Sequence, residues 1–303
     1  MNAAPSRFSH LYSSVCICGF SISAMYLNLN PNAVEIEGLE LKQLIDLARR
    51  HGFEGIAPPL GQIAAMDEPR RAAQMVQAAG LRWGAMGMTV EFRASEDQFE
   101  AGMRALPNAA ALAAQIGCTR CSTWLMPCDD ALDYEANFKH HARRLALVAR
   151  VLAEQGVRFG IEFVGPRTLR ETKKYSFVHT LDQCLALCAA IGHDCGVLFD
   201  SFHWYTSGGT EDDITKKLTG RIVDVHVNDA IPGRGPDGQL DRERALPCDT
   251  GVIDLEAFVR GLKAIDYDGP ITVEPMIQSF AQEPPDQVAA KVAASLRRMM
   301  GEQ

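Results

Sequence analysis

Short apolar runs alternate along this chain with longer segments in which apolar residues return every three or four positions. A short apolar run between turn signals is typical of a buried strand, and the longer period is typical of an amphipathic helix. The pattern predicts strands at residues 15–20, 55–58, 82–88, 119–125, 158–164, 196–200, 222–228 and 271–274. Regular alternation of strands with helices indicates a parallel β/α fold.

The predicted helices lie between these strands and after the last one, at residues 39–51, 68–79, 98–116, 134–155, 181–191, 212–218, 254–265 and 285–300. Glycines such as Gly117 and Gly192 directly follow several of them, where a helix end favours a left-handed residue. The pattern predicts a single (β/α)8 TIM barrel over residues 1–303, with residues 1–14 as a flexible tail. An open doubly wound sheet is disfavoured, because no G-x-G-x-x-G or P-loop motif follows the first strand.

Four polar residues stand near the ends of the last four predicted strands: Glu162, Asp200, His226 and Glu274. Side chains alternate between the two faces of a strand, so each strand can be divided by parity. The faces opposite these residues are apolar and suit a covering of helices; they carry Val157, Phe159, Ile161, Phe163, Val223, Val225, Val227, Ile271 and Val273. The four polar side chains are therefore expected to point into the barrel and to converge.

Composition narrows the classes of partner. The net charge of −8 disfavours nucleic acid, because binding its phosphates needs clustered Lys and Arg. Nine cysteines are scattered and several lie inside apolar runs, which is typical of reduced thiols in the cytoplasm. The apolar stretch at residues 15–24 is too short to span a membrane and weak as a signal peptide. We expect a cytoplasmic enzyme that acts on a small molecule, with no membrane or nucleic-acid partner.

The donor set of the four polar residues suits one divalent metal ion. Three carboxylates and one imidazole favour Mn²⁺, with Mg²⁺ or Co²⁺ possible and Zn²⁺ less suited. Such an ion polarises a hydroxy-carbonyl group and acidifies the adjacent C–H, so that one carboxylate can remove a proton and another can return it. One inward carboxylate alone could be a salt-bridged structural group, but four on consecutive strands favour the metal site.

Several segments resemble the sugar phosphate isomerase/epimerase group of xylose isomerase-like barrels, which includes ketose 3-epimerases and inosose dehydratases. These are GIEFVGP, LFDSFHWY, DVHVNDA and GVIDLEAFVRGLKAIDYDGPITVEP, and the resemblance runs from about Gly52 to Glu274. It implies metal ligands at Glu162, Asp200, His226 and Glu274, with the two glutamates as the acid/base pair. It also implies substrate contacts at His203 and Arg234, and a homodimer or homotetramer.

Other candidate substrate contacts come from position alone. Trp124 ends the fourth predicted strand and can form an apolar wall for a sugar ring. Lys173 lies in a long basic connection, at residues 164–180, that could supply a phosphate contact. The sequence departs from the group at the second strand, where Ala57, Pro58 and Pro59 replace an acidic residue of many relatives.

Several activities remain open from the sequence. Epimerisation or isomerisation of a ketose or keto-sugar derivative is the leading hypothesis. The same enediolate could instead expel a β-leaving group, which would make the protein a dehydratase or a lyase acting on an inosose or a 3-keto-glycoside. A non-catalytic sugar-binding barrel is an alternative of another class. The three-zinc endonuclease IV pattern is disfavoured, because residues 84–88 and 122–125 contain no histidine.

Overall fold

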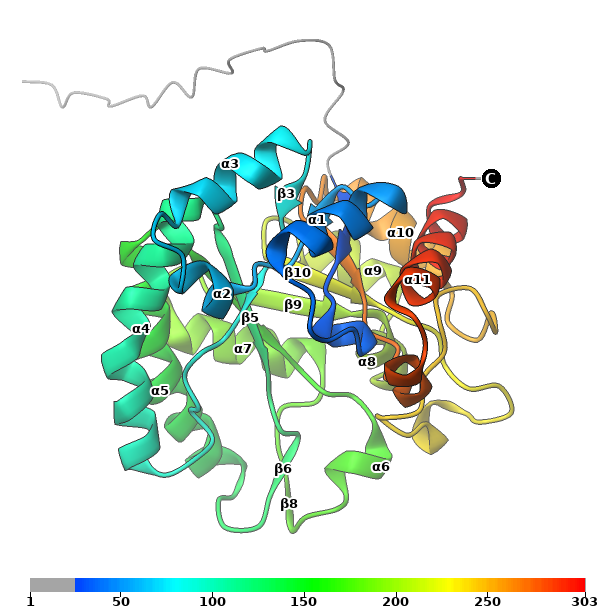
Figure 1. The fold of residues 1–303 in the computed structure, drawn as a ribbon. Coiled ribbons are helices and arrows are strands. Elements are labelled where there is room, and N and C mark those ends of the chain that lie inside the picture. Colours follow the sequence, from blue (N-terminus) through cyan, green and yellow to red (C-terminus); the bar gives the residue numbers. More distant parts are fainter. Residues whose placement is uncertain (1–24, 303) are drawn as a thin grey trace, which may run out of the picture.

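In the computed structural model, residues 25–302 are described, and their parallel strands form one curled sheet (Figure 1). The sheet order is β3-β2-β1-β11-β10-β9-β7-β5-β4. The strands are β1 (Tyr26–Leu29), β2 (Gly55–Ile56), β3 (Arg82–Trp83), β4 (Met86–Gly87), β5 (Arg120–Trp124), β7 (Arg158–Glu162), β9 (Gly196–Asp200), β10 (Ile222–Val227) and β11 (Pro270–Val273). The first and last members of this order, β3 and β4, are consecutive in the chain. The backbone between them therefore closes the ring, and the predicted TIM barrel is confirmed.

The first strand of the barrel is β1, which the sequence pattern did not predict. The strand predicted at 15–20 and the tail predicted at 1–14 lie outside the described residues. Strand β1 lies between β11 and β2, with Tyr26 opposite Pro270 and Asn28 opposite Gly55. Because β1 already pairs with both neighbours, the ring is complete within the described chain.

The third barrel position is a strand in two halves, β3 and β4, where the sequence predicted one run at 82–88. Strand β3 pairs with β2, and β4 pairs with β5. A Cβ atom at Gly84, between the halves, would lie 2.5 Å from Oδ1 of Asn28. The backbone thus approaches a buried side chain of β1 where only glycine fits.

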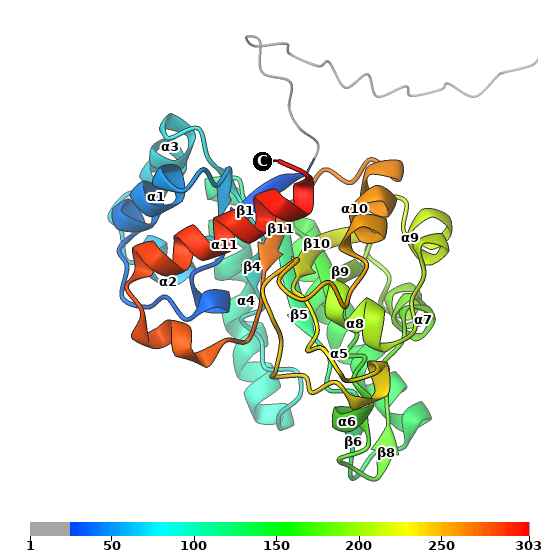
Figure 2. The same cartoon turned by 90° about the vertical axis from the view of Figure 1, so that its right-hand side faces the viewer.

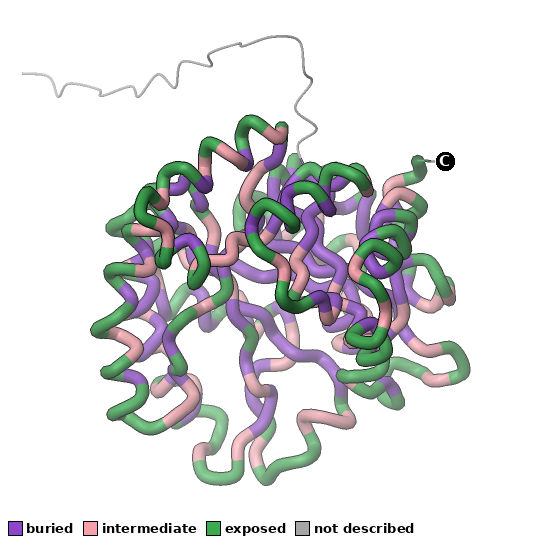
Figure 3. Tube along the Cα trace, viewed as in Figure 1, coloured by how far each residue is buried: buried purple, intermediate pink, exposed green. Residues whose placement is uncertain are grey.

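Helices surround the sheet on its outer face (Figure 2). They are α1 (Leu41–Arg50), α3 (Arg70–Ala78), α4 (Glu96–Ile116), α5 (Tyr134–Glu154), α7 (Leu181–Ile191), α9 (Glu211–Lys217), α10 (Leu255–Ala264) and α11 (Pro285–Met300). Ser95 and Thr180 begin α4 and α7 with capping boxes. The helices bury apolar stripes against the strands, and burial is concentrated in the barrel wall (Figure 3). No helix within residues 25–302 is long and apolar enough to cross a membrane.

The connections at the carboxyl ends of the strands contain short elements that the sequence pattern did not predict. Strands β6 (Cys128–Asp129) and β8 (Tyr175–Ser176) pair antiparallel, next to α6 (Arg167–Arg170) (Figure 1). Helix α8 (Ser201–Thr206) follows β9 directly. A further long connection, residues 230–253, contains the 3-10 helix η2 (Pro236–Gly238). Smaller elements α2 (Leu60–Ala64), η1 (Asn32–Val34) and η3 (Gln278–Gln282) complete the described chain.

The parity argument holds along the late strands except at Val223. Outward residues such as Phe159, Val225 and Ile271 belong to the apolar core beneath the helices. The pairing of β10 with β9 shifts register between Ile222 and Asp224, which is a β-bulge. A Cβ at inward-facing Gly160 would lie 2.8 Å from the Cβ of Val223. The bulge therefore turns Val223 into the barrel, and the prediction that it faces the helices was wrong.

Candidate metal centre

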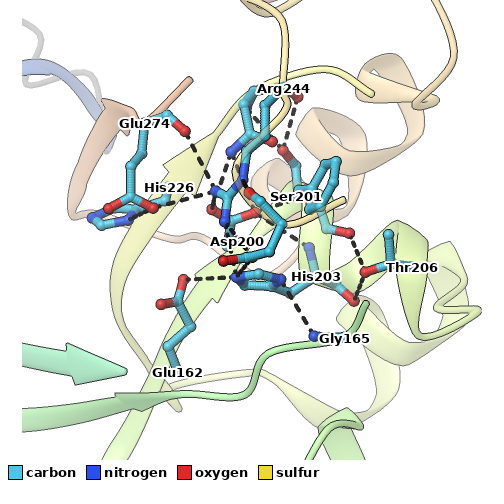
Figure 4. Close-up of polar contacts among 12 residues, drawn as sticks. Glu162, Gly165, Asp200, Ser201, His203, Thr206, His226, Arg244 and Glu274 are labelled. Carbon is cyan, nitrogen blue, oxygen red and sulfur yellow. Dashed lines mark hydrogen bonds and ion pairs between the residues drawn. The ribbon is translucent and has the colours of Figure 1, made fainter. Parts of the chain in front are cut away.

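The four predicted ligands lie together at the carboxyl end of the barrel (Figure 4). Glu162 and Asp200 end β7 and β9, His226 lies in β10 opposite Asp200, and Glu274 directly follows β11. One potential ligand atom from each residue lies within 4.8 Å of the others. Glu162, Asp200 and His226 are buried, and Glu274 is partly exposed. The strands thus hold three carboxylates and one imidazole around one small space.

Two atoms of this group lack hydrogen-bond partners. Oε1 of Glu162 and Nδ1 of His226 are buried without a hydrogen bond, and their contacts are longer: Nε2 of His203 at 3.8 Å and Oε2 of Glu274 at 3.5 Å. A buried polar atom without a partner costs about 1–3 kcal/mol, so such atoms usually face a ligand or an ion. Nε2 of His226 is 3.6 Å from Oδ2 of Asp224, a carboxylate on the inner side of the barrel that suits an orienting partner for a metal-binding histidine. The residues present therefore fit a divalent cation.

The acidic side chains have opposed titration behaviour. Burial, followed by the charges of Glu274 and Asp200, raises the pKa of Glu162 well above its usual range. Burial alone would also raise the pKa of Glu274, but His226 and Arg244 outweigh it and lower that pKa to about 2. Burial is likewise the main cause that raises the pKa of Asp200. The negative charges around Glu162 are thus only partly neutralised by the cationic side chains of the site.

Arg244 is the site residue that sequence reasoning did not select. It comes from the 230–253 connection, and its side chain is 1% exposed. Nη1 lies 3.2 Å from Oδ2 of Asp200 and 3.3 Å from Oε2 of Glu274, and Nη2 donates to Oδ1 of Asp241 at 2.9 Å. Burial favours the neutral form, but Asp200, Glu274 and Asp241 together raise the pKa of Arg244. A permanently charged guanidinium therefore lies against two of the four predicted ligands.

His203 lies one helical turn beyond Asp200. Oδ1 of Asp200 accepts hydrogen bonds from the amides of Phe202 and His203, which places Asp200 at the N-cap of α8. The amide of Gly165 donates to Nδ1 of His203 at 3.3 Å. Burial, followed by the charge of Arg244, lowers the pKa of His203 well below its usual range, so the ring is neutral. From the bond that Nδ1 accepts from Gly165, we assign the ring hydrogen to Nε2.

This tautomer makes His203 a donor toward the candidate metal centre. Nε2 lies 3.8 Å from Oε1 of Glu162 and 3.3 Å from Nη2 of Arg244 (Figure 4). In this tautomer the 3.3 Å contact between Nε2 and Nη2 of Arg244 joins two donors and is not a hydrogen bond. They instead form a pair of donors that could share one oxygen atom of a bound molecule.

A cavity of about 630 Å³ opens beside Glu162 and Glu274. Its lining includes Glu162, Glu274, His203 and Arg244, together with predicted contact Trp124. Two other predicted contacts do not line it. Arg234 forms an ion pair with Glu243 at 2.7 Å, and Lys173 is exposed in the segment between α6 and β8. The strand pattern predicted where the four candidate ligands lie. The loop sequence, in contrast, contains no pattern that would favour Arg244 over Arg234 as a residue of the site.

Comparisons with known proteins place the fold in a family. The family model described as xylose isomerase-like TIM barrel matches residues 45–299. This chain belongs to that family. A xylose isomerase domain protein from Alicyclobacillus acidocaldarius is 31% identical, with a TM-score of 0.80 over 92% of this chain and 99% of that one. The family resemblance predicted from the sequence is confirmed.

More distant relatives add context. An inosose isomerase from Bacillus velezensis is 30% identical over 138 residues, which are 45% of this chain and 46% of that protein. The match thus spans less than half the length of this curated relative. The IOLI protein, solved with a bound zinc atom, shares the fold at 19% identity, with a TM-score of 0.76 over 91% of this chain and 98% of that one.

Proposed function

We propose that this protein is a sugar isomerase or epimerase that requires one divalent metal ion. It would abstract a proton next to the carbonyl of a ketose or keto-sugar derivative. The observation that carries the proposal is the convergence of Glu162, Asp200, His226 and Glu274 within 4.8 Å, with two of their atoms buried and without a hydrogen bond. The similarity to an inosose isomerase supports the reaction class.

Glu162, Asp200, His226 and Glu274 would hold the ion. Their three carboxylates and one imidazole favour Mn²⁺, with Mg²⁺ or Co²⁺ next. When bound, the ion would supply Lewis acidity to a hydroxy-carbonyl group of the substrate. Asp224 would keep the His226 ring oriented through Nε2, leaving Nδ1, which lies 3.5 Å from Oε2 of Glu274, to bind the ion.

Glu162 and Glu274 would act as the acid/base pair. They approach the space beside Asp200 from two sides (Figure 4). A proton removed by one carboxylate and returned by the other on the opposite face inverts a carbon, which is the requirement for epimerisation. Their pKa values are driven in opposite directions, which is a common arrangement for a proton donor and a proton acceptor.

His203 and Arg244 would bind the oxygen on which negative charge develops. The Nε2–H of His203 and the guanidinium of Arg244 are donors 3.3 Å apart, between the two glutamates. Donors already fixed in a water-poor site stabilise an enediolate more than mobile water does. Burial of both side chains keeps them in place, with 2% and 1% of their side-chain surfaces exposed.

Solvent deuterium exchange into a panel of ketoses, inososes and 3-keto-glycosides tests this proposal, first with Mn²⁺ and then with a chelator. Mass spectrometry and NMR of the products separate epimerase, isomerase and lyase outcomes. We expect metal-dependent exchange that Glu162→Gln and Glu274→Gln each reduce by at least about a hundredfold, the usual weight of general acid/base catalysis.

Glu256→Gln, on the exposed face of α10, is the matched control and should exchange like the parent protein. Near-normal exchange in either active-site variant would contradict the assigned roles. Tight metal binding without exchange on any member of the panel would favour the sugar-binding alternative.

A further inference from the structure

Six apolar side chains line the cavity besides its acidic residues, and the charged residues Asp241, Arg242 and Glu243 also line it. Within residues 25–302, three large apolar side chains are exposed: Trp124, Tyr134 and Leu240. Two of these, Trp124 at 42% and Leu240 at 37% exposure, line the cavity above the metal centre. The remaining apolar lining residues are Met126, Val164, Leu169 and Met276. Exposed apolar side chains gathered at one cavity indicate a binding surface.

Trp124 is held in place as a flat platform. The guanidinium of Arg93 lies 4.3 Å from the centre of the indole ring, in a cation–π arrangement. Arg93 also donates to Oγ1 of Thr123 at 3.1 Å and to the carbonyl of Trp124, and it pairs with Glu91 at 3.2 Å. An indole positioned before binding loses little conformational freedom when a ligand stacks on it.

Leu240 is presented by an ordered part of its loop. The preceding residue, Gln239, is fully buried, and its side-chain amide bonds to both backbone groups of Ile231 and to the carbonyl of Arg234. The hydroxyl of Thr168 donates to the backbone carbonyl of Gln239 at 2.6 Å. Leu240 is therefore held in its exposed position by the hydrogen bonds of the preceding residue.

The volume of the cavity and the charges of its lining indicate which chemical group it can bind. Water occupies about 30 Å³ per molecule in the liquid, so a cavity of about 630 Å³ has room for roughly twenty non-hydrogen atoms, more than one six-carbon sugar has. Within the described chain, its cationic lining residues are Arg242 and Arg244. Arg244 already pairs with Asp200 and Asp241. A phosphate on the substrate could pair only with the exposed Arg242, whereas an apolar group could pack against six apolar side chains of the lining.

We propose that the outer part of the cavity is a subsite for an apolar, preferably aromatic, group attached to the sugar. The substrate is then a keto-sugar glycoside with an apolar aglycone, its sugar at the metal centre and its aglycone between Trp124 and Leu240. This inference rests on the proposed function, because that function places the sugar carbonyl beside Glu162 and Glu274.

Titration calorimetry with phenyl and methyl β-D-glucopyranoside tests the subsite in the Mn²⁺-loaded protein. Neither probe has a carbonyl, so neither undergoes exchange. We expect the phenyl glycoside to bind about tenfold more tightly, from burial and stacking of its ring. Trp124→Ala and Leu240→Ala should each reduce this preference to about threefold or less, with Leu240→Ala leaving the methyl glycoside unaffected. Tyr134→Ala, the exposed aromatic outside the cavity, is the control and should keep the full preference.

Equal affinity for the two glycosides, no binding of either, or a preference that both cavity variants retain would overturn the subsite. So would tighter binding of glucose 6-phosphate that Arg242→Ala abolishes. Deuterium exchange on the corresponding 3-keto-glycosides is a separate measurement. A phenyl preference without metal-dependent exchange would refute the proposed function alone, and exchange with equal affinities would refute the subsite alone.

Discussion

Replacement of Arg244 by glutamine should destabilise the metal-free protein far more than the metal-loaded protein. The guanidinium lies 3.2–3.3 Å from carboxylate oxygens of Asp200 and Glu274. Opposite charges about 4 Å apart attract by about 4 kcal/mol each at an effective dielectric constant of 20, before the cost of desolvation. Removing one partner from a buried ion pair typically costs about 3–5 kcal/mol net, because the remaining charge is left uncompensated.

A divalent ion among the same carboxylates would replace the missing positive charge. We therefore expect Arg244→Gln to lower the free energy of unfolding by about 3–5 kcal/mol with a chelator present, and by less than half of that with saturating Mn²⁺. Urea denaturation followed by circular dichroism, with and without Mn²⁺, measures both values. The variant should gain more stability from the ion than the parent protein does.

Arg260→Gln provides the matched control. Arg260 pairs with Glu211 and Glu256 on the surface, with half of its side chain exposed, and such pairs contribute about 1 kcal/mol or less. The reasoning is refuted if Arg244→Gln loses equal stability in both conditions. A loss below about 1 kcal/mol in the metal-free protein would also refute it, since Arg244 would then compensate little charge.

Two further predictions concern stability. Burial lowers the pKa of His141 to about 4, below the value of about 6.5 in the unfolded chain. Between these two pH values the unfolded chain therefore binds more protons than the folded protein. The free energy of unfolding should fall by about 3 kcal/mol as the pH drops from 6.5 to 4. His141→Gln should show a shallower fall in urea titrations over that window, and identical slopes would contradict the prediction. Asp229 accepts backbone hydrogen bonds from Ala230, Thr250, Gly251 and Ile253. Asp229→Ala should therefore lower the free energy of unfolding by about 3–5 kcal/mol and speed amide hydrogen exchange of residues 250–253. Asp237→Ala, at an exposed carboxylate, is its control, and unchanged exchange in Asp229→Ala would sink the idea.

The late strands were predictable because local pattern determines them. Strand parity alone predicts that Glu162, Asp200, His226 and Glu274 point inward, and their positions in the structure follow from parallel registry. The bulge at Val223 was not predictable, because it depends on the missing side chains of Gly160 and Gly196 on two other strands. Parity arguments are sound for regular strands and fail where neighbouring strands force a register shift.

The loops were not predictable for a related reason. Arg244 reaches the candidate metal centre because Asp229 and Gln239 fix the 230–253 connection through hydrogen bonds that have no sequence periodicity. Strands β6 and β8 pair across more than forty residues, and their two-residue length gives no apolar pattern. The expectation of a homodimer or homotetramer stays a prediction.

Asp200 divides its two oxygens between two tasks, and this division would couple metal binding to the placement of His203. Oδ1 caps α8, whereas Oδ2 accepts hydrogen bonds from Arg244 and from the side-chain amide of Asn228. His203 follows Asp200 by three positions within a single helical turn, so the backbone spacing of the two residues is set by helix geometry. A ligand held by Asp200 and a donor on His203 would therefore keep a fixed spacing, and a change of substrate would have to come from loops such as the 230–253 connection.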